Sequence, residues 1–437
     1  MKNTLIDPSV VESKIKEANL TKLDFASIRE IVKVVNLIEE ETGEKYIRME
    51  MGVPGLPSPS IGVEAEKAAL DAGVTSIYPN IEGLPQLKEE TARFVKLFLD
   101  IDINPKGCIP TVGSLMGSMA CFLVINRNDS SREGTLFIDP GFPVHKQQVK
   151  ILGQDYRSFD IYDYRGGKLR NKLESYLKRG KVSSILYSNP NNPAWICFTQ
   201  EELKIIGELA TKYDVAVIED LAYFGMDFRE DYMKPGEPPY QPTVANYTDN
   251  YVLLISSSKA FSYAGQRIGM TIISDHLYNR RYPDLLRYYT SDLFGHAIVF
   301  GALYAQSAGV THTTQYGLKA MLKAVNDGEY NYVNDVKEYG EKAKIMKQMF
   351  IANGFEIVYD TDIDRPIADG FYFTISFPGM SSGELLKNLL YYGISAISLN
   401  ITGSTRSEGL RACVSQIPRS MLPAFEERVQ KFYEDFK

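Results

Sequence analysis

Short apolar segments alternate with longer amphipathic segments along the middle of the chain. The longer segments, such as 199–213, carry apolar residues at helical spacing. Short buried strands that alternate with helices indicate βαβ units and a largely parallel sheet. The pattern therefore predicts an α/β fold whose ligands bind beyond the carboxyl ends of the strands. The predicted strands lie at 108–113, 135–139, 183–188, 215–220, 251–256 and 269–274.

The two ends of the chain show a different pattern. Residues 9–43 carry apolar residues at helical spacing, and Gly43 is a plausible helix stop. The segment 46–51 resembles a strand and leads into a loop rich in glycine and proline at 52–60. The tail, 355–437, mixes strands with helices. We therefore expect a second, smaller α+β domain.

The composition is that of an ordinary globular protein, with 44% apolar and 24% charged residues among 437. The net charge of −7 argues against a nucleic-acid-binding protein, which normally carries a basic excess. The four cysteines form no CxxC pair, so neither a metal site nor a disulfide framework is expected. The N-terminal residues lack the apolar core of a signal peptide, and no uncharged run reaches the length of a membrane helix. We expect a cytoplasmic protein without a membrane segment.

One stretch, SSSKAFSYAGQRIG at 256–269, combines the groups that an anionic carbonyl compound requires. The hydroxyls of Ser256 and Ser258 and the guanidinium of Arg267 can hold phosphate oxygens. Lys259 can form a Schiff base with an aldehyde. Pyridoxal 5'-phosphate carries both a phosphate and an aldehyde. Taken alone, however, a lysine in a serine-rich loop is slightly better explained as a solvated surface residue.

Four other positions carry candidate chemistry, and each also has an ordinary structural explanation. The turn Gly113-Ser114 precedes a helix, which suits an anion pocket and equally an ordinary βα turn. Asp220 ends a strand, where an aspartate usually caps a helix. Asn192 lies in NPNNP, a turn signal. Arg411 lies in the apolar strand LRACVS, where a charge needs a partner such as a substrate carboxylate.

The lysine stretch, Asp220 followed by Tyr223, and the NPNNP segment together resemble the class I/II pyridoxal-phosphate-dependent aminotransferases, the fold-type-I superfamily that includes aspartate aminotransferase. The resemblance covers essentially the whole chain, in the order and approximate spacing of the family. It implies a large domain with a mostly parallel seven-stranded sheet flanked by helices, at 61–325. It also implies a smaller α+β domain built from both chain ends, at 1–60 and 326–437.

The resemblance also assigns a cofactor, pyridoxal 5'-phosphate, and residues that bind it. Lys259 would be the Schiff-base lysine and proton shuttle, and Asp220 would pair with the protonated pyridine nitrogen. Tyr78 would reach the phosphate of the neighbouring subunit's cofactor. The other cofactor-binding residues would be Gly113, Ser114, Leu115, Phe142, Asn192, Tyr223, Ser256, Ser258 and Arg267.

Some of these residues have more specific roles in the family pattern. Phe142 would stack on the cofactor ring, and Tyr223 and Asn192 would hydrogen-bond its phenolic oxygen. In the substrate site, Arg411 would grip the α-carboxylate. Gly52 would belong to the loop that closes over the substrate, and Asn192 would also contribute there.

The sequence departs from the family pattern in two places. Trp195, the only tryptophan, stands where the family has a glycine. The dicarboxylate-specific members use a second arginine, which the partner subunit provides, and the corresponding segment 290–301 has none, although Arg281 and Arg287 lie earlier. We therefore expect a preference for neutral substrate side chains, because an unpaired buried carboxylate is costly. An apolar pocket for them could include Tyr288, Tyr289 and Phe294.

The resemblance implies a homodimeric aminotransferase with shared active sites. It would move an α-amino group from an amino acid to a 2-oxo acid by a ping-pong route. A β-eliminating carbon–sulfur lyase or a decarboxylase shares every cofactor residue and stays an alternative, which product analysis distinguishes. A second alternative is a non-catalytic regulatory or binding domain, usually fused to a DNA-binding segment; residues 1–45 are too short and not basic enough to favour it.

Overall fold

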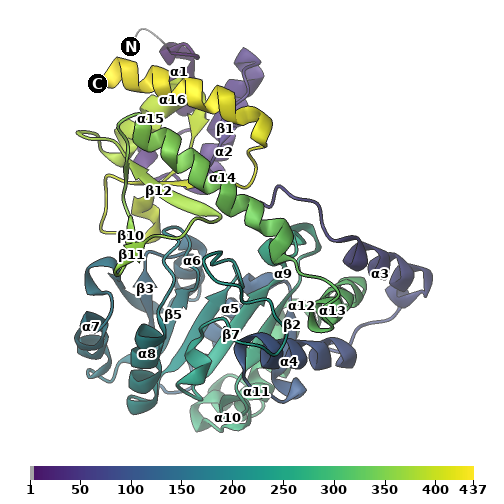
Figure 1. The fold of residues 1–437 in the computed structure, drawn as a ribbon. Helices are drawn as coiled ribbons and strands as arrows, with labels where there is room; N and C mark the ends of the chain where they lie inside the picture. The colour runs from purple at the N-terminus through teal and green to yellow at the C-terminus, as the bar shows by residue number, and fades with distance from the viewer. Residues whose placement is uncertain (1–3) are drawn as a thin grey trace.

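The computed structural model describes residues 4–437, which form two bodies, one above the other in Figure 1. A seven-stranded sheet in the order β2-β8-β7-β6-β5-β3-β4 forms the centre of the larger body. All its strands run in one direction except β8, which is antiparallel to both neighbours. This confirms the predicted α/β fold. The strands are β2 (Cys108–Thr111), β3 (Gly134–Asp139), β4 (Asp155–Asp160), β5 (Val182–Ser188), β6 (Ala216–Leu221), β7 (Tyr251–Ser256) and β8 (Gly269–Ile273).

Both faces of this sheet are apolar because side chains alternate along a strand. On β7, Val252 and Leu254 belong to one buried apolar cluster, and Leu253 and Ile255 belong to the other. The first cluster includes residues of α5 (Gly113–Ile125), α6 (Pro143–Ile151) and the π-helical segment Ala297–Leu303. The second includes residues of α4 (Pro85–Leu99), α7 (Lys168–Leu177) and α8 (Gln200–Lys212). Helices therefore cover the sheet on both sides.

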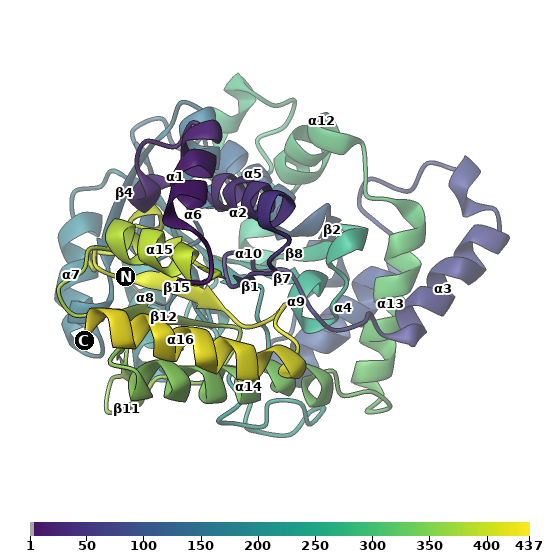
Figure 2. The same ribbon diagram turned by 90° about the horizontal axis from the view of Figure 1, so that it is seen from above.

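The smaller body contains a four-stranded antiparallel sheet in the order β14-β15-β12-β9, covered by helices. Seen from above in Figure 2, α14 and α16 lie side by side along one edge of this body. Within residues 4–437, no helix is both long enough and apolar enough to cross a membrane. The elements are α1 (Pro8–Glu17), α2 (Ile28–Thr42), α14 (Val333–Ala352), β9 (Glu356–Ile357), β10 (Thr361–Asp362), β11 (Arg365–Pro366), β12 (Tyr372–Ser376), α15 (Ser382–Tyr391), β14 (Ile397–Ser398), β15 (Leu410–Cys413) and α16 (Leu422–Phe436).

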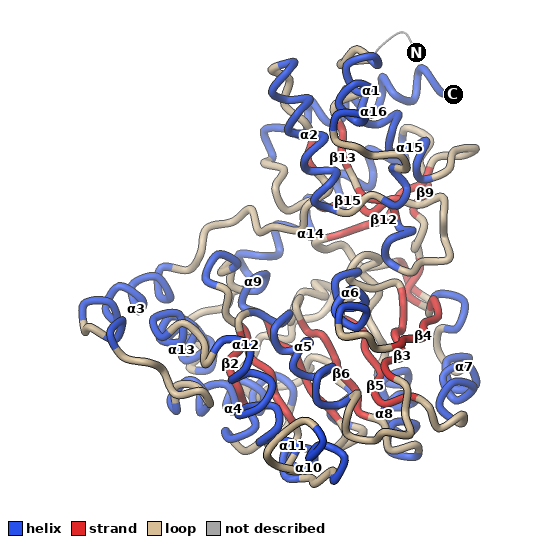
Figure 3. Tube along the Cα trace, turned by 180° about the vertical axis from the view of Figure 1, so that it is seen from behind, coloured by secondary structure: helices blue, strands red, loops and turns tan. Residues whose placement is uncertain are grey.

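Both ends of the chain contribute to the smaller body. β1 (Ile47–Arg48) pairs in parallel with β13 (Ile394–Ser395). From behind, Figure 3 shows the long loop that leaves this body and leads to α3 (Ser60–Asp71). α3 packs against α13 (His312–Asn326) in the larger body. The domain limits after residues 60 and 325 stay a prediction.

The N-terminal elements are shorter than the sequence pattern predicts. The segment 9–43 is not one helix, because α1 ends at Glu17 and α2 begins at Ile28. Asn19 has a positive φ of 60°, which a helix cannot continue. Ser27 and Glu30 then form a reciprocal capping box that starts α2. Of the predicted strand 46–51, only β1 pairs with another strand.

Candidate active site

A cavity of about 650 Å³ lies between the two bodies, beyond the carboxyl ends of β6 and β7. Its walls also include the beginnings of α5 and α6 and, from the smaller body, the beginning of α2. Most of the residues that the sequence assigned to the site line this cavity. They are Gly52, Ser114, Leu115, Phe142, Asn192, Asp220, Tyr223, Ser256, Ser258, Lys259, Arg267 and Arg411.

Lys259 lies in α9 (Ser257–Ala260), directly after β7. Its Nζ donates a hydrogen bond to the carbonyl oxygen of Gly52. Burial lowers the pKa of Lys259 to about 8, and the positive charges of Arg411 and Arg267 act in the same direction. More of this amine is therefore neutral near pH 7 than for a solvated lysine, and the neutral amine is the nucleophilic form.

Asp220 is buried near the end of β6 and faces a histidine that the sequence analysis missed. Its Oδ2 lies 3.9 Å from Nε2 of His145, and its Oδ1 has no hydrogen-bond partner among residues 4–437. Burial raises the pKa of Asp220 to about 7 and lowers the pKa of His145 to about 4. The imidazole is therefore neutral near pH 7. No motif marked His145, which lies at the start of α6 with its ring 5.7 Å from the ring of Phe142.

One end of the cavity is suited to an anion. Arg267 has no ion pair with a carboxylate in the described part of the chain, and its Nη1 lies 3.5 Å from the hydroxyl of Ser258. The first residue of α5, Gly113, has a φ of 68°. A Cβ on Gly113 would lie 2.5 Å from Nη2 of Arg267, so glycine allows the guanidinium to approach the helix N-terminus. Ser114 and Leu115 line the cavity, whereas Gly113 itself does not.

Arg411 lies on β15 and is 1% exposed. Its Nη1 donates to Oδ1 of Asn192 at 3.3 Å, and its Nη2 donates to the carbonyl oxygen of Glu50. The Glu50 carboxylate is already paired with Arg48, at 2.8 Å. Among residues 4–437, Arg411 thus has no carboxylate partner, and its Nε has no hydrogen-bond partner. A buried guanidinium of this kind requires an anionic ligand.

Tyr372 is a second cavity residue that the sequence analysis missed. It lies on β12, and its ring centre is 4.5 Å from the guanidinium carbon of Arg411. A Cβ on Gly52 would lie 1.9 Å from the Tyr372 hydroxyl, so only glycine allows this approach. No motif marked Tyr372, because its segment FYFTISF is consistent with an ordinary buried strand.

Trp195 has a left-handed backbone conformation, which glycine, the residue of the family pattern at this position, adopts easily. Its φ is 62°, in the left-handed region, and its side chain is fully buried. The indole lies 5.1 Å from the ring of Tyr223 and 6.2 Å from that of Tyr372. A Cβ on Gly370 would lie 1.9 Å from the indole. The turn after Asn192 is therefore kept, and Trp195 packs behind the wall of the cavity.

Several predicted residues do not reach the cavity of their own chain. Tyr78 is 91% exposed and lies outside it. Tyr288, Tyr289 and Phe294 do not line it either, so in this chain they form no apolar substrate pocket. Arg281 pairs with Asp292 at 2.5 Å, and Arg287 lies over the ring of Tyr288.

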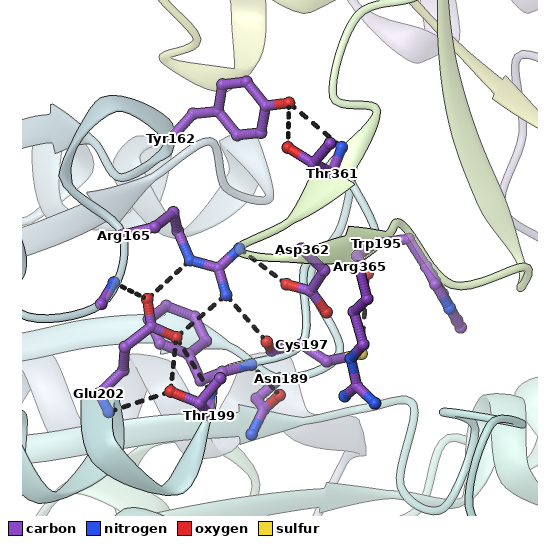
Figure 4. Close-up of polar contacts among 12 residues, drawn as sticks. Tyr162, Arg165, Asn189, Trp195, Cys197, Thr199, Glu202, Thr361, Asp362 and Arg365 are labelled. Carbon is purple, nitrogen blue, oxygen red and sulfur yellow. Dashed lines mark hydrogen bonds and ion pairs between the residues drawn. The ribbon is translucent and has the colours of Figure 1, made fainter.

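Four charged residues, Arg165, Glu202, Arg229 and Asp362, join the two bodies, and we call them the interdomain seam. Figure 4 shows Arg165, from the larger body, between Glu202 and Asp362. Arg165 pairs with Glu202 and with Asp362, each at 2.7 Å, and Asp362 also pairs with Arg229 at 2.8 Å. Asp362 belongs to the β10–β11 hairpin of the smaller body and is 2% exposed. The hairpin thus places a buried carboxylate between two arginines of the larger body.

Comparison with known proteins identifies relatives over most of the chain. The family model described as aminotransferase class I and II matches residues 45–429. An aspartate aminotransferase of Pyrococcus horikoshii is 25% identical over 84% of this chain and 83% of its own. An LL-diaminopimelate aminotransferase of Aquifex aeolicus is 28% identical over 80% and 82%. Among solved structures, an alanine aminotransferase of Pyrococcus furiosus has the same fold, with a TM-score of 0.74 at 19% identity over 96% and 99% of the two chains.

Proposed function

The chain belongs to the class I and II aminotransferase family, and we propose that its cavity holds pyridoxal 5'-phosphate attached through Lys259. It is an aminotransferase, which moves an α-amino group between an amino acid and a 2-oxo acid. The family generally depends on this cofactor. The observation that supports the assignment best is that one cavity collects Lys259, the buried carboxylate Asp220 and the guanidiniums of Arg267 and Arg411.

The anion-binding end fits the phosphate group. Arg267 has no carboxylate partner in residues 4–437, so its charge is available to an anionic ligand. Ser256 and Ser258 line the same end with their hydroxyls. Ser114 and Leu115 would add backbone N–H groups at the beginning of α5. Arginine side chains and helix N-termini both stabilise the negative charge of a phosphate group.

The buried carboxylate fits the ring nitrogen. Oδ1 of Asp220 lacks a hydrogen-bond partner within the described residues, and such a group needs a donor. A protonated ring nitrogen would supply that donor, and its charge would lower the pKa of Asp220 from about 7. Phe142 would stack on the ring, and Tyr223 and Asn192 would face its phenolic oxygen. When bound, the cofactor supplies an electron sink for the electron pair released at the substrate Cα.

The remaining groups would bind and deprotonate the substrate. Arg411, with Asn192 beside it, would hold the α-carboxylate in the orientation that the reaction needs. Lys259 would accept the proton from Cα, since its lowered pKa of about 8 suits a general base near neutral pH. Gly52 would close over the substrate from the smaller body, where its carbonyl oxygen already accepts a hydrogen bond from Lys259.

Product analysis of the purified holoenzyme tests this function. Each of a panel of amino donors is mixed with a 2-oxo acid, and both new products are measured. A new amino acid and the matching 2-oxo acid in equal amounts support transfer. Pyruvate with ammonia would identify a lyase, and release of carbon dioxide a decarboxylase. Either result without transfer would contradict the proposal.

We also propose that two identical subunits share their active sites. Tyr78 is 91% exposed and its neighbour Ile77 is 62% exposed, so two adjacent large side chains are open to contact with another subunit. Ile77 lies against α13, since its carbonyl oxygen is 3.2 Å from Nδ1 of His312. Sedimentation should give a dimer. Mixed dimers of Tyr78→Ala and Lys259→Ala subunits should regain activity, whereas a monomer or a failure of the mixture to regain any would contradict sharing.

A further inference from the structure

The cavity carries more positive charge than the proposed function uses. Four cationic side chains line it: Arg29, Lys259, Arg267 and Arg411. Asp220 is the only carboxylate among the lining residues. In the proposed function, Arg267 binds the cofactor phosphate and Lys259 attaches the cofactor. Arg411 binds the substrate α-carboxylate. Arg29 remains without an assigned partner.

Arg29 belongs to the smaller body and is the second residue of α2. Its side chain is exposed, and it makes no ion pair with any residue from 4 to 437. The acidic residue beside it, Glu30, is occupied, because its carboxylate accepts a hydrogen bond of 2.7 Å from the backbone of Ser27 in the capping box. The charge of Arg29 is therefore available to a ligand in the cavity.

Two of the three residues that line the cavity beside Arg29 are apolar, and the third is Ser27. Phe25 and Ile28 line the cavity together with Arg29, and Phe25 is 60% exposed. A methylene chain can lie against such side chains, while a charged group at its end is paired with a guanidinium. This arrangement suits a ligand with an apolar middle and an acidic group at each end.

We propose that Arg29 binds the side-chain carboxylate of an amino dicarboxylic acid, or of the matching 2-oxo dicarboxylic acid, while Arg411 binds the α-carboxylate. This rests on the proposed function of the cavity. It replaces the expectation of a neutral side chain, which followed from the lack of arginine at 290–301. The sequence offered two other arginines, but neither Arg281 nor Arg287 lines the cavity of this chain.

Isosteric substrate pairs test the proposal in the holoenzyme. Glutamate and glutamine, like aspartate and asparagine, have nearly the same shape and differ in charge. We expect wild type to prefer the acid in at least one pair. Arg29→Gln should lower kcat/KM for that acid by about tenfold, since tenfold corresponds to about 1.4 kcal/mol, and change the amide by less than about twofold. Arg29→Lys should keep part of the preference, because lysine keeps the charge but not the paired donors.

Lys33 provides the matched control. It is an exposed cation one turn further along α2 and does not line the cavity. Lys33→Gln should leave both acid-to-amide ratios unchanged. The proposal is overturned if wild type prefers the amide in both pairs, if Arg29→Gln leaves both ratios unchanged, or if it lowers acid and amide equally.

A binding measurement separates this inference from the proposed function. Glutarate has two carboxylates but no amino or oxo group, and pentanoate has one carboxylate at the same chain length. By calorimetry, wild type should bind glutarate at least tenfold more tightly than pentanoate, and Arg29→Gln should lose that difference. If glutarate shows this advantage but no donor is transaminated, the Arg29 site is supported and the proposed function is contradicted. If transamination occurs but glutarate binds no more tightly than pentanoate, the Arg29 site is contradicted and the proposed function is supported.

Discussion

The hydroxyl of Tyr223 donates a hydrogen bond of 2.8 Å to the hydroxyl of Tyr372. Tyr223 is 3% exposed and Tyr372 is 2% exposed, so water does not replace this contact. Tyr223 comes from the larger body and Tyr372 from the smaller one. Because Tyr372 also lies against the guanidinium of Arg411, the bond links the proposed cofactor contact to the proposed carboxylate contact across the two bodies.

The two tyrosines should show energetic coupling. Tyr223→Phe or Tyr372→Phe alone leaves one buried hydroxyl unpaired and should destabilise the protein by about 1–2 kcal/mol. The double variant should cost less than the sum, with a coupling of about 1 kcal/mol, measured by denaturant unfolding. Tyr46 bonds instead to the carbonyl oxygen of Leu390 at 2.7 Å, so Tyr46→Phe combined with Tyr372→Phe serves as an additive control. Strict additivity of the first pair would contradict the coupling.

Borohydride reduction of the holoenzyme should attach the cofactor to Lys259 alone. Peptide mass mapping would locate the added mass. Lys342 serves as the comparison lysine in the same protein. Burial lowers its pKa, as it does for Lys259, and Lys342 is only 4% exposed. It lies outside the cavity and donates to the carbonyl oxygens of Ser415 and Ile417. A label on Lys342, or on no lysine, would refute the assignment, and Lys259→Ala should lose turnover.

Asp220 should make the cofactor-free protein less stable as the pH rises. Its pKa is about 7 when folded, above the value of about 4 expected for an unfolded aspartate, so the folded protein binds the extra proton. That stabilisation is complete below about pH 4 and is lost as the pH rises through 7. Between pH 5 and pH 8, wild type should lose about 2 kcal/mol more unfolding free energy than Asp220→Asn, which cannot titrate. Equal losses would show that Asp220 is not the titrating group.

The interdomain seam should depend on Asp362. Asp362→Asn removes a buried charge between Arg165 and Arg229, while Arg165 keeps Glu202 and Arg229 keeps Asp227. Because each guanidinium keeps one carboxylate, we expect a loss of unfolding free energy below the about 3–5 kcal/mol of a fully broken buried pair, which denaturant unfolding would detect. Asp364 lies in the same hairpin region but is exposed, so Asp364→Asn should change stability by less than about 0.5 kcal/mol. Similar effects of the two substitutions would exclude a special role of the seam.

Local sequence patterns were sufficient to predict most strands of the large sheet. The segment 251–256 coincides with β7, because a short apolar run between turn residues is typical of a buried strand. The direction of β8 was not predictable, since the apolar pattern does not encode direction. The β10–β11 hairpin was also missed, because most of its residues are exposed and polar and lack a period-two pattern.

The site residues divide in a similar way. The position of Lys259 and Asp220 in the cavity was predictable because each lies in a short motif at the carboxyl end of a strand. His145 and Tyr372 were not, because their importance comes from what the fold places beside them. Arg29 is the extreme case: nothing in SIREIVK distinguishes it from any cation on a helix surface until the smaller body folds over the cavity.

The contact between Trp195 and Gly370 restricts the order in which substitutions can accumulate. A Cβ on Gly370 would lie 1.9 Å from the indole, so no side chain is compatible with Trp195 in this position. A lineage could gain the tryptophan only with glycine already at 370, and it can change that glycine only after the tryptophan has gone. Joint saturation mutagenesis of both positions should therefore recover larger residues at 370 only beside small ones at 195. We therefore expect the two positions to change together, although neither lines the cavity.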